Sequence, residues 1–217
     1  MNASASRSGW IDTTGAIGAI LVPAAILLSF LTSSDSGSTA AELIAYAKDK
    51  QTEIWWLQVV GLAAPLLIGL FVASLWSRLR DAGDGYRALT LVGGTLFIAF
   101  LSTALTLWAA PLIDTDGLTP AGAAGYLVFD DAGWVLLGIA GISIGVMISA
   151  VSLAALEHGW VPAWAGWVSL LLGVVSFATV VAAGIFAWSI WLIAAGVYLL
   201  VKRRRTVAAV QPPQPVA

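Results

Sequence analysis

The chain has 217 residues, of which 59% are hydrophobic and 10% are charged, and its formal net charge is −2. A soluble domain carries about 25% charged residues, so this composition excludes a water-exposed globular surface and predicts a membrane protein built as one bundle. The sequence contains no cysteine and a single histidine, His158. These counts exclude thiol catalysis, disulfides and thiolate metal sites, and they leave too few ligands for a histidine-based metal or haem site.

The first predicted elements are a polar N-terminal segment, residues 1–13, and a transmembrane span at about residues 14–32. A Ser/Gly-rich loop follows. Thr39 and Glu42 then have the spacing of a capping box, in which a hydroxyl and a carboxylate satisfy free N–H groups at the start of a helix. The apolar residues after them predict a short helix at about residues 39–50, which lies on the membrane surface or caps the bundle.

Three further apolar segments predict spans two, three and four, at about residues 54–77, 88–110 and 133–156. Residues 121–129 lie between the third and the fourth span and are too few to cross a membrane. We therefore expect these residues to form a separate helix that is interfacial or partly re-entrant.

The longest uncharged stretch is residues 163–201, which contain no Asp, Glu, Lys, Arg or His. One straight helix of this length would measure about 58 Å, roughly twice the hydrocarbon core of a bilayer. The stretch is therefore predicted to fold back on itself as spans five and six, at about residues 163–182 and 185–201, with a turn near Gly184.

Six spans make residues 14–205 one all-α domain, a polytopic transmembrane bundle of six helices, followed by a disordered proline-rich tail at residues 206–217. An even number of spans places both termini on the same side of the membrane. That side receives most of the basic residues: Arg7, Arg78, Arg80, Arg87 and residues 202–205. The opposite side receives Lys48 and Lys50. Basic loops face the cytoplasm, so both termini are predicted to be cytoplasmic, in a bacterial inner (plasma) membrane.

Several of these features occur together in a known family. They are the surface helix in the first outer loop, the basic second inner loop, a tryptophan-bearing last helix that ends in basic residues, and the start of span five, Val161-Pro162-Ala163-Trp164-Ala165-Gly166-Trp167. The chain resembles a family of bacterial six-helix membrane proteins classed as a domain of unknown function. The resemblance implies a six-span fold and assigns no activity.

Four polar residues on the predicted outer side form a candidate ligand mouth: Glu53, Gln58, Asp130 and Asp131. Ionisable groups at membrane depth are costly and often functional, so one hypothesis is an outward-facing mouth for a cationic or amphipathic small molecule. The alternative is structural. Gln58 can hydrogen-bond another helix, and the two aspartates stand at the start of a predicted span, where water and the helix N-terminus stabilise negative charge.

One stretch resembles part of an enzyme motif. Asp81-Ala-Gly-Asp84-Gly85-Tyr-Arg-Ala88 is similar to the first half of the CDP-alcohol phosphatidyltransferase motif, D-x-x-D-G-x-x-A-R followed by G-x-x-x-D-x-x-x-D. That chemistry needs four aspartates around divalent metals. The conserved arginine, second glycine and last two aspartates of the motif are replaced here by Leu89, Ile98, Ser102 and Thr106. We therefore interpret the stretch as a solvated turn between helices.

We expect a non-catalytic membrane protein without cofactor, metal or nucleic-acid partner. The favoured prediction is a scaffold or accessory partner of other membrane components, bound to another membrane protein or to copies of itself. A packing face for such a partner is predicted at Gly141, Gly145 and Ser149, whose four-residue spacing lets a second helix approach closely. The alternative is a carrier or receptor for a lipid or hydrophobic small molecule, with a cavity between spans two, three and four. A degenerate lipid-headgroup transferase is the third candidate.

Overall fold

The computed structural model describes residues 3–32, 39–109, 118–178 and 183–210, and every regular element in these ranges is helical. The elements are α1 (Ala3–Thr32), α2 (Ala40–Asp49), α3 (Gln51–Arg78), the 3-10 turn η1 (Leu79–Asp81), α4 (Asp84–Ala109), α5 (Pro120–Glu157), α6 (Ala163–Ser176) and α7 (Ala183–Val210). The predicted all-α fold is confirmed.

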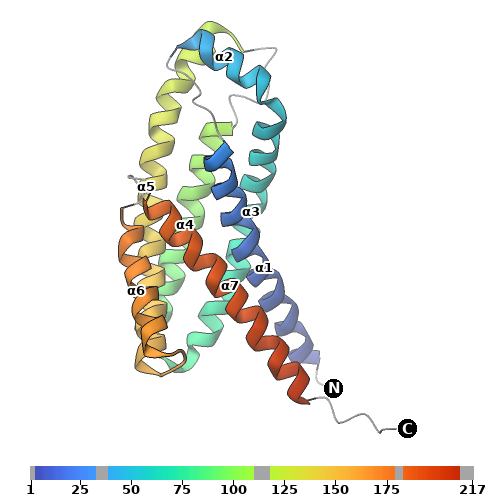
Figure 1. Cartoon of the computed structure of the whole chain (residues 1–217), viewed down its shortest axis with the longest axis vertical. Helices are drawn as coiled ribbons and strands as arrows, with labels where there is room; N and C mark the ends of the chain where they lie inside the picture. The colour runs from blue at the N-terminus through green and yellow to red at the C-terminus, as the bar shows by residue number, and fades with distance from the viewer. Residues whose placement is uncertain (1–2, 33–38, 110–117, 179–182, 211–217) are drawn as a thin grey trace, which may run out of the picture.

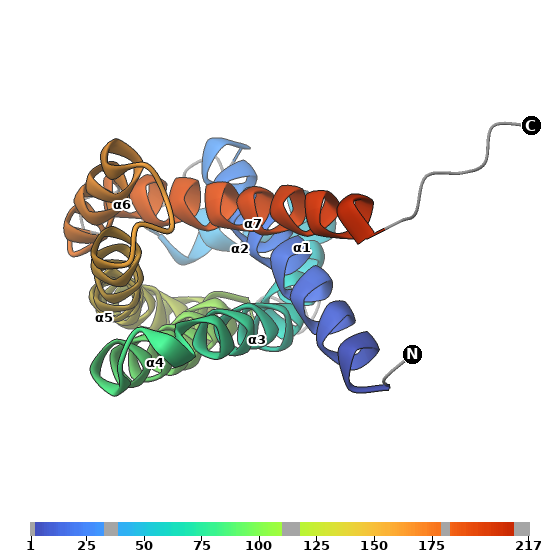
Figure 2. The ribbon, with the colours of Figure 1, turned by 90° about the horizontal axis from the view of Figure 1, so that it is seen from below.

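Six of these helices form a closed ring, in which the neighbours in space are α1, α3, α4, α5, α6, α7 and then α1 again. Figure 2 shows this ring from below. The start of α1 and the end of α7 lie at the same end of the bundle, which we call the termini end. The opposite end, which we call the α2 end, is covered by α2, which packs on α5 and α3 (Figure 1).

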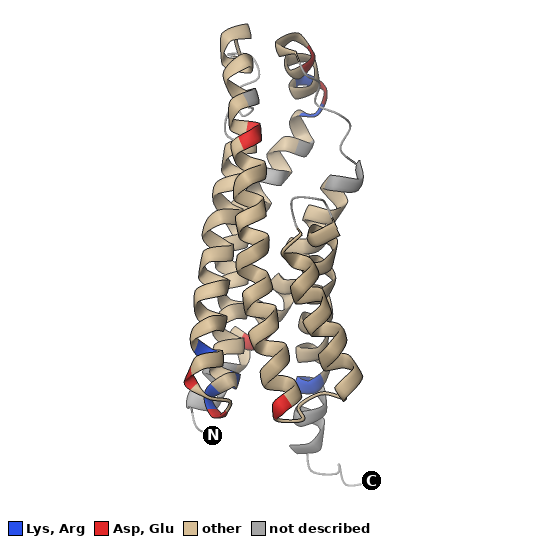
Figure 3. Ribbon diagram, turned by 90° about the vertical axis from the view of Figure 1, so that its left-hand side faces the viewer, with Lys and Arg blue, Asp and Glu red and all other residues tan. Residues whose placement is uncertain are grey.

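Five helices, α1, α3, α4, α5 and α7, are long and apolar enough to cross a membrane. Helix α6 has 14 residues, which amounts to about 21 Å and falls short of a hydrocarbon core of about 30 Å. Charged residues of the described helices gather toward the two ends of the bundle, with an uncharged stretch between them (Figure 3). The fold is that of a multi-pass membrane protein.

Helix α5 corrects the prediction of a separate short helix at residues 121–129. Residues 120–157 form one continuous helix of 38 residues, about 57 Å long. Its start follows the sequence signals, because Pro120 is the first helical residue and the Thr119 hydroxyl accepts the N–H of Gly122 at 3.1 Å. No proline follows Pro120 before the end of α5 at Glu157, and an aspartate pair does not end a helix. The first turns of α5 therefore extend the predicted fourth span toward α2.

Helix α2 and the ends of α3 and α5 form a small apolar cluster of their own: Leu43, Ala47, Ile54, Ala123 and Tyr126. The capping box is present. The Thr39 hydroxyl accepts the N–H of Glu42 at 3.3 Å, and the Glu42 carboxylate accepts the N–H of Thr39 at 3.1 Å. This cluster gives the α2 end a packed cap outside the main core.

Three predicted boundaries differ from the structure. Helix α1 already begins at Ala3, within the predicted polar segment, and α7 continues to Val210, into the predicted tail, whose remaining residues lie outside the described ranges. Helix α6 ends at Ser176, earlier than predicted for span five, in a turn where two N–H groups donate to carbonyls three residues back. The turn predicted near Gly184 falls largely on residues 179–182, which lie outside the described ranges, and Gly184 itself is buried in the first turn of α7.

Glycines set the closest helix contacts around the ring. An added Cβ at Gly15 of α1 would lie 2.7 Å from the Phe71 nitrogen of α3, and one at Gly93 of α4 would lie 2.7 Å from the Ser143 oxygen of α5. Gly196 of α7 would meet α1 in the same way. Helices in lipid associate largely through such close packing, because the hydrophobic effect does not drive them together there.

Aromatic side chains fill the middle of the ring. Phe97 of α4 and Trp188 of α7 are fully buried, with ring centroids 5.3 Å apart in an edge-on arrangement. Phe71 of α3 and Trp191 of α7 form a second such pair at 6.2 Å. These aromatic pairs thus connect α7 with α3 and α4 across the middle of the ring.

Candidate functional site

One residue of the predicted ligand mouth, Gln58, binds another helix of the same chain. Its side-chain Nε2 donates to the backbone oxygen of Ala109, the last residue of α4, at 2.8 Å. Carbonyls in the last turn of a helix have no partner within that helix and are satisfied by a side chain or by water. Gln58 therefore caps α4, as the structural alternative expected.

The two aspartates of the mouth lie inside α5 and not at its start. The helix begins at Pro120, so the argument from a helix N-terminus does not apply to Asp130 and Asp131. Asp130 is half-buried, and its backbone oxygen accepts the indole N–H of Trp108 at 3.3 Å, whereas Asp131 is exposed. Glu53 lies in the first turn of α3, and its side chain is outside the described part of the structure.

The face of small residues on α5 packs on α6. An added Cβ at Gly145 would lie 2.7 Å from the Gly173 oxygen, and one at Gly173 would lie 2.8 Å from the Ser149 hydroxyl. Gly141, one turn earlier, is buried. This face is therefore occupied within the chain and does not point outward toward a partner.

The structure instead holds a cavity at the termini end, with a volume of about 620 Å³. Ligand pockets measure roughly 300–1,000 Å³, so the volume suits a small molecule. Its lining comes from α3, α5, α6, α7 and the connections at this end, and none of the four predicted mouth residues takes part. Most of the lining is apolar, including Leu75, Leu79, Val151, Ala155, Leu172, Ala195 and Leu199.

The cavity opens where α6 and α7 bind different neighbours. Helix α6 follows α5 through the contact between Gly173 and Ser149, whereas the lower half of α7 follows α1. There an added Cβ at Gly196 would lie 2.6 Å from the Ala16 oxygen. The two helices diverge toward the termini end (Figure 1). Near that end, the Tyr198 hydroxyl of α7 donates to the backbone oxygen of Trp160, in the connection before α6, at 3.3 Å.

A hydrogen-bonded cluster lies on the cavity wall and joins α5, α6 and α7. The indole N–H of Trp191 donates to the hydroxyl of Ser169, which in turn is hydrogen-bonded to the hydroxyl of Ser152. Ser152 donates to the Ile148 oxygen at 2.7 Å. Because the Ser152 hydroxyl donates its single proton to the Ile148 oxygen, Ser169 is the donor in the hydrogen bond between the two serines. The cluster is satisfied without a ligand and fixes the wall.

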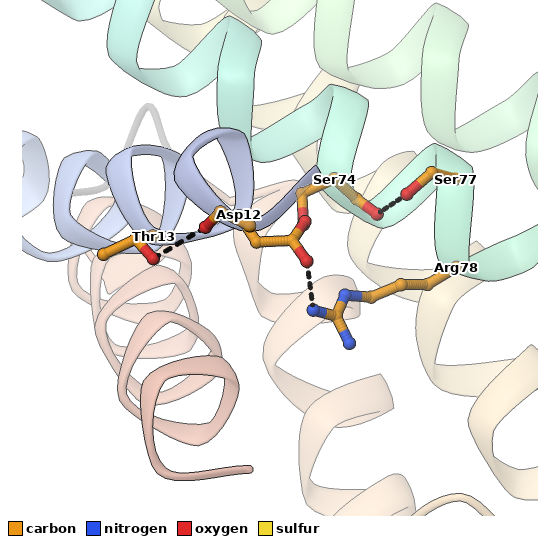
Figure 4. A network of polar contacts seen from close by, with 6 residues as sticks. Asp12, Thr13, Ser74, Ser77 and Arg78 are labelled. Atoms are coloured by element: carbon orange, nitrogen blue, oxygen red, sulfur yellow. Dashed lines mark hydrogen bonds and ion pairs between the residues drawn. The ribbon is translucent and has the colours of Figure 1, made fainter. Parts of the chain in front are cut away.

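The rim of the cavity carries the charged and ionisable side chains of its lining: Arg78, Asp81, His158 and Lys202. Arg78 is held by Asp12 of α1, with Nη2 and Oδ2 2.9 Å apart (Figure 4). The hydroxyl of Ser74 donates to the other carboxylate oxygen at 2.6 Å. Asp12 and Arg78 remain 26% and 33% exposed, so the pair sits at the boundary of the membrane-spanning part.

The stretch that resembles a transferase motif forms a turn. Gly83 has a φ of 104°, a conformation that favours glycine. The Asp84 side chain is 99% exposed and pairs with Arg87 at 3.2 Å, while Asp81 lies on the cavity rim. Within the described residues, no group of three or more His, Asp or Glu side chains could hold a metal ion.

Sequence reasoning missed the cavity and the pair of Asp12 with Arg78. One signal was available, because the two residues carry opposite charges at the same end of spans one and two. No protein-family model, curated protein or solved structure matches the chain. The resemblance to six-helix proteins of unknown function therefore stays a prediction.

Proposed function

We propose that this protein is a membrane-embedded carrier or receptor for a lipid-like molecule, which it holds in the cavity between α3, α5, α6 and α7. The observation that carries the proposal is the cavity itself, a largely apolar space of about 620 Å³ with polar groups confined to its rim and one hydrogen-bonded cluster. Such a combination of apolar walls and few polar groups is typical of small-molecule sites.

The proposal includes the topology. Counting α6 as a span gives six passes, and the basic residues of the termini end then point to the cytoplasm of a bacterial plasma membrane. In that orientation the cavity lies at the depth of the inner leaflet. This differs from the outward-facing mouth predicted between spans two, three and four.

The scaffold role predicted from the sequence is less well supported. It relied on a free face of small residues on α5, and that face is covered by α6. Partner binding or self-association through another surface stays a prediction.

The test is to fill the cavity without disturbing the lipid-facing surface. Ala195→Phe adds a ring to the cavity wall, whereas the matched control Ala73→Phe adds the same ring to an exposed position of α3 outside the cavity. Native mass spectrometry of protein purified from its host membrane, at rising collision energy, removes loosely attached lipids first. We expect one molecule to stay on the wild type and the control and to be lost from Ala195→Phe. Equal retention by all three proteins would refute the proposal.

A further inference from the structure

The size of the cavity limits the class of molecule it can hold, an inference that rests on the proposed function. A water-sized group such as a methylene occupies about 30 Å³ of liquid volume, so 620 Å³ corresponds to roughly 20 non-hydrogen atoms. A lipid with two acyl chains exceeds this number, so one of its chains would have to lie outside the cavity, through the open side. A lipid with one chain matches it.

The lining has an apolar layer and a polar layer. On each of three helices, one residue of the apolar layer is followed three positions later by one residue of the polar layer. Residues three apart lie on one face of a helix, and in each case an apolar lining residue precedes a polar one: Leu75 and Arg78 on α3, Ala155 and His158 at the end of α5, and Leu199 and Lys202 on α7. The apolar layer lies deeper in the bundle than the polar layer. A ligand there needs an apolar body and a polar head that faces the termini end.

The charge of the rim favours an anionic head. Arg78 and Lys202 are basic, and Asp81 is the one acidic residue among the described residues of the lining. Arg78 binds Asp12 through Nη2, while its Nε is buried and has no hydrogen-bond partner within the described part of the chain, so the donors left for a ligand are on the two terminal nitrogens. A guanidinium carries five N–H donors, so the ion pair leaves donors for an anion.

We propose that the cavity binds a single-chain lipid with an anionic headgroup. Its chain lies against Leu75, Leu172 and Leu199, and its carboxylate or phosphate lies at the rim beside Arg78 and Lys202. Lys202 also contacts the Tyr198 ring, with Nζ 5.6 Å from the ring centroid, and this contact fixes the lysine on the cavity side of α7.

The experiment measures quenching of tryptophan fluorescence by bromine-labelled lipids in the full chain reconstituted into phosphatidylcholine nanodiscs. Trp160, Trp164 and Trp191 line the cavity and report on its occupant. The probes share one brominated chain and differ in the head: a carboxylate, a lysophosphatidylglycerol, a neutral alcohol and an alkylamine. We expect saturable quenching by an anionic probe at about tenfold lower concentration than by the alcohol, as hydrogen bonds to a charged group allow. Comparison of the carboxylate probe with the lysophosphatidylglycerol probe shows whether the cavity prefers a carboxylate or a phosphate headgroup.

Variants test the headgroup contact. Lys202→Gln, and separately the double variant Asp12→Asn with Arg78→Gln, which removes the ion pair without stranding one charge, should reduce the preference for anions. The control Arg80→Gln with Arg87→Gln removes two positive charges at the same end but outside the cavity and should keep the preference. Equal binding of acid and alcohol to the wild type would overturn the anionic headgroup, while loss of both in Ala195→Phe would leave the proposed function intact. Absence of saturable quenching by every probe would overturn both.

Discussion

At the α2 end, polar side chains bind backbone groups of neighbouring helices, whereas at the termini end they surround a cavity. Gln58 caps α4 and Trp108 binds a backbone oxygen of α5, so these groups join neighbouring helices. At the other end, Arg78 and Lys202 stand on helices that diverge. The contrast shows that polar residues near a membrane boundary either join neighbouring helices or line a space where the helices separate.

The largest expected effect comes from the seam between α5 and α6, because the cavity exists only while α6 stays on α5. Gly145→Ala places a methyl group 2.7 Å from the Gly173 oxygen and should cost about 1–3 kcal/mol in the free energy of unfolding. The matched control Gly125→Ala, on the same helix with nothing within 4 Å, should be neutral or stabilising by up to about 1 kcal/mol. Unfolding in mixed micelles measures both changes. Equal effects at the two glycines would contradict the packing described for α5 and α6.

The ion pair at the termini end should give the next largest effect. Arg78→Gln leaves the Asp12 carboxylate without its cation in a partly buried position, and we expect a loss of about 1–2 kcal/mol, between the values for exposed and buried pairs. The double variant with Asp12→Asn should lose less than the sum of the two single variants. A double-mutant cycle of unfolding free energies measures this coupling, and strict additivity would show that the pair contributes nothing.

The smallest effect is expected at the α2 end, and it sharpens the comparison of the two ends. Gln58→Ala removes one hydrogen bond to Ala109 and should lower the unfolding free energy by about 1 kcal/mol. It should leave the lipid retained in native mass spectrometry unchanged, as should Asp131→Asn. If either variant released the retained lipid, the site would lie at the predicted outer mouth and not in the cavity.

Sequence patterns predict that the helices exist, but they do not predict where all of the helices begin and end. Hydrophobic runs and the uncharged residues 163–201 predict the apolar segments, and Thr39 with Glu42 predicts the start of α2. Composition could not show that Asp130 and Asp131 lie within one long helix, because charged residues mark a membrane boundary without breaking backbone hydrogen bonds. The early end of α6 was also beyond prediction, since the sequence there contains no charged residue, proline or glycine between Ser176 and Ala183.

The cavity could not be predicted because it depends on which neighbouring helix α6 and α7 each pack against. Gly173 directs α6 toward α5, and Gly196 directs α7 toward α1. Both glycines look alike in the sequence, and small residues occur on nearly every helix of this chain. The residues that line the space, such as Leu75 and Ala195, have no feature that separates them from lipid-facing residues.

The order of helices around the ring bears on how the protein is made. Chains fold from the N-terminus as they are synthesised, and α1 and α3 can pair early through Gly15 and the bond between Asp12 and Arg78. Helix α7, which is synthesised after the other five helices of the ring, must then insert against α1, at Ala16 and Gly196. Until that moment one flank of α1 and the future cavity are open to lipid. A nascent chain stalled before α7 would therefore present the cavity walls on α3, α5 and α6 to the bilayer, and a lipid lying against them would gain its remaining wall when α7 inserts.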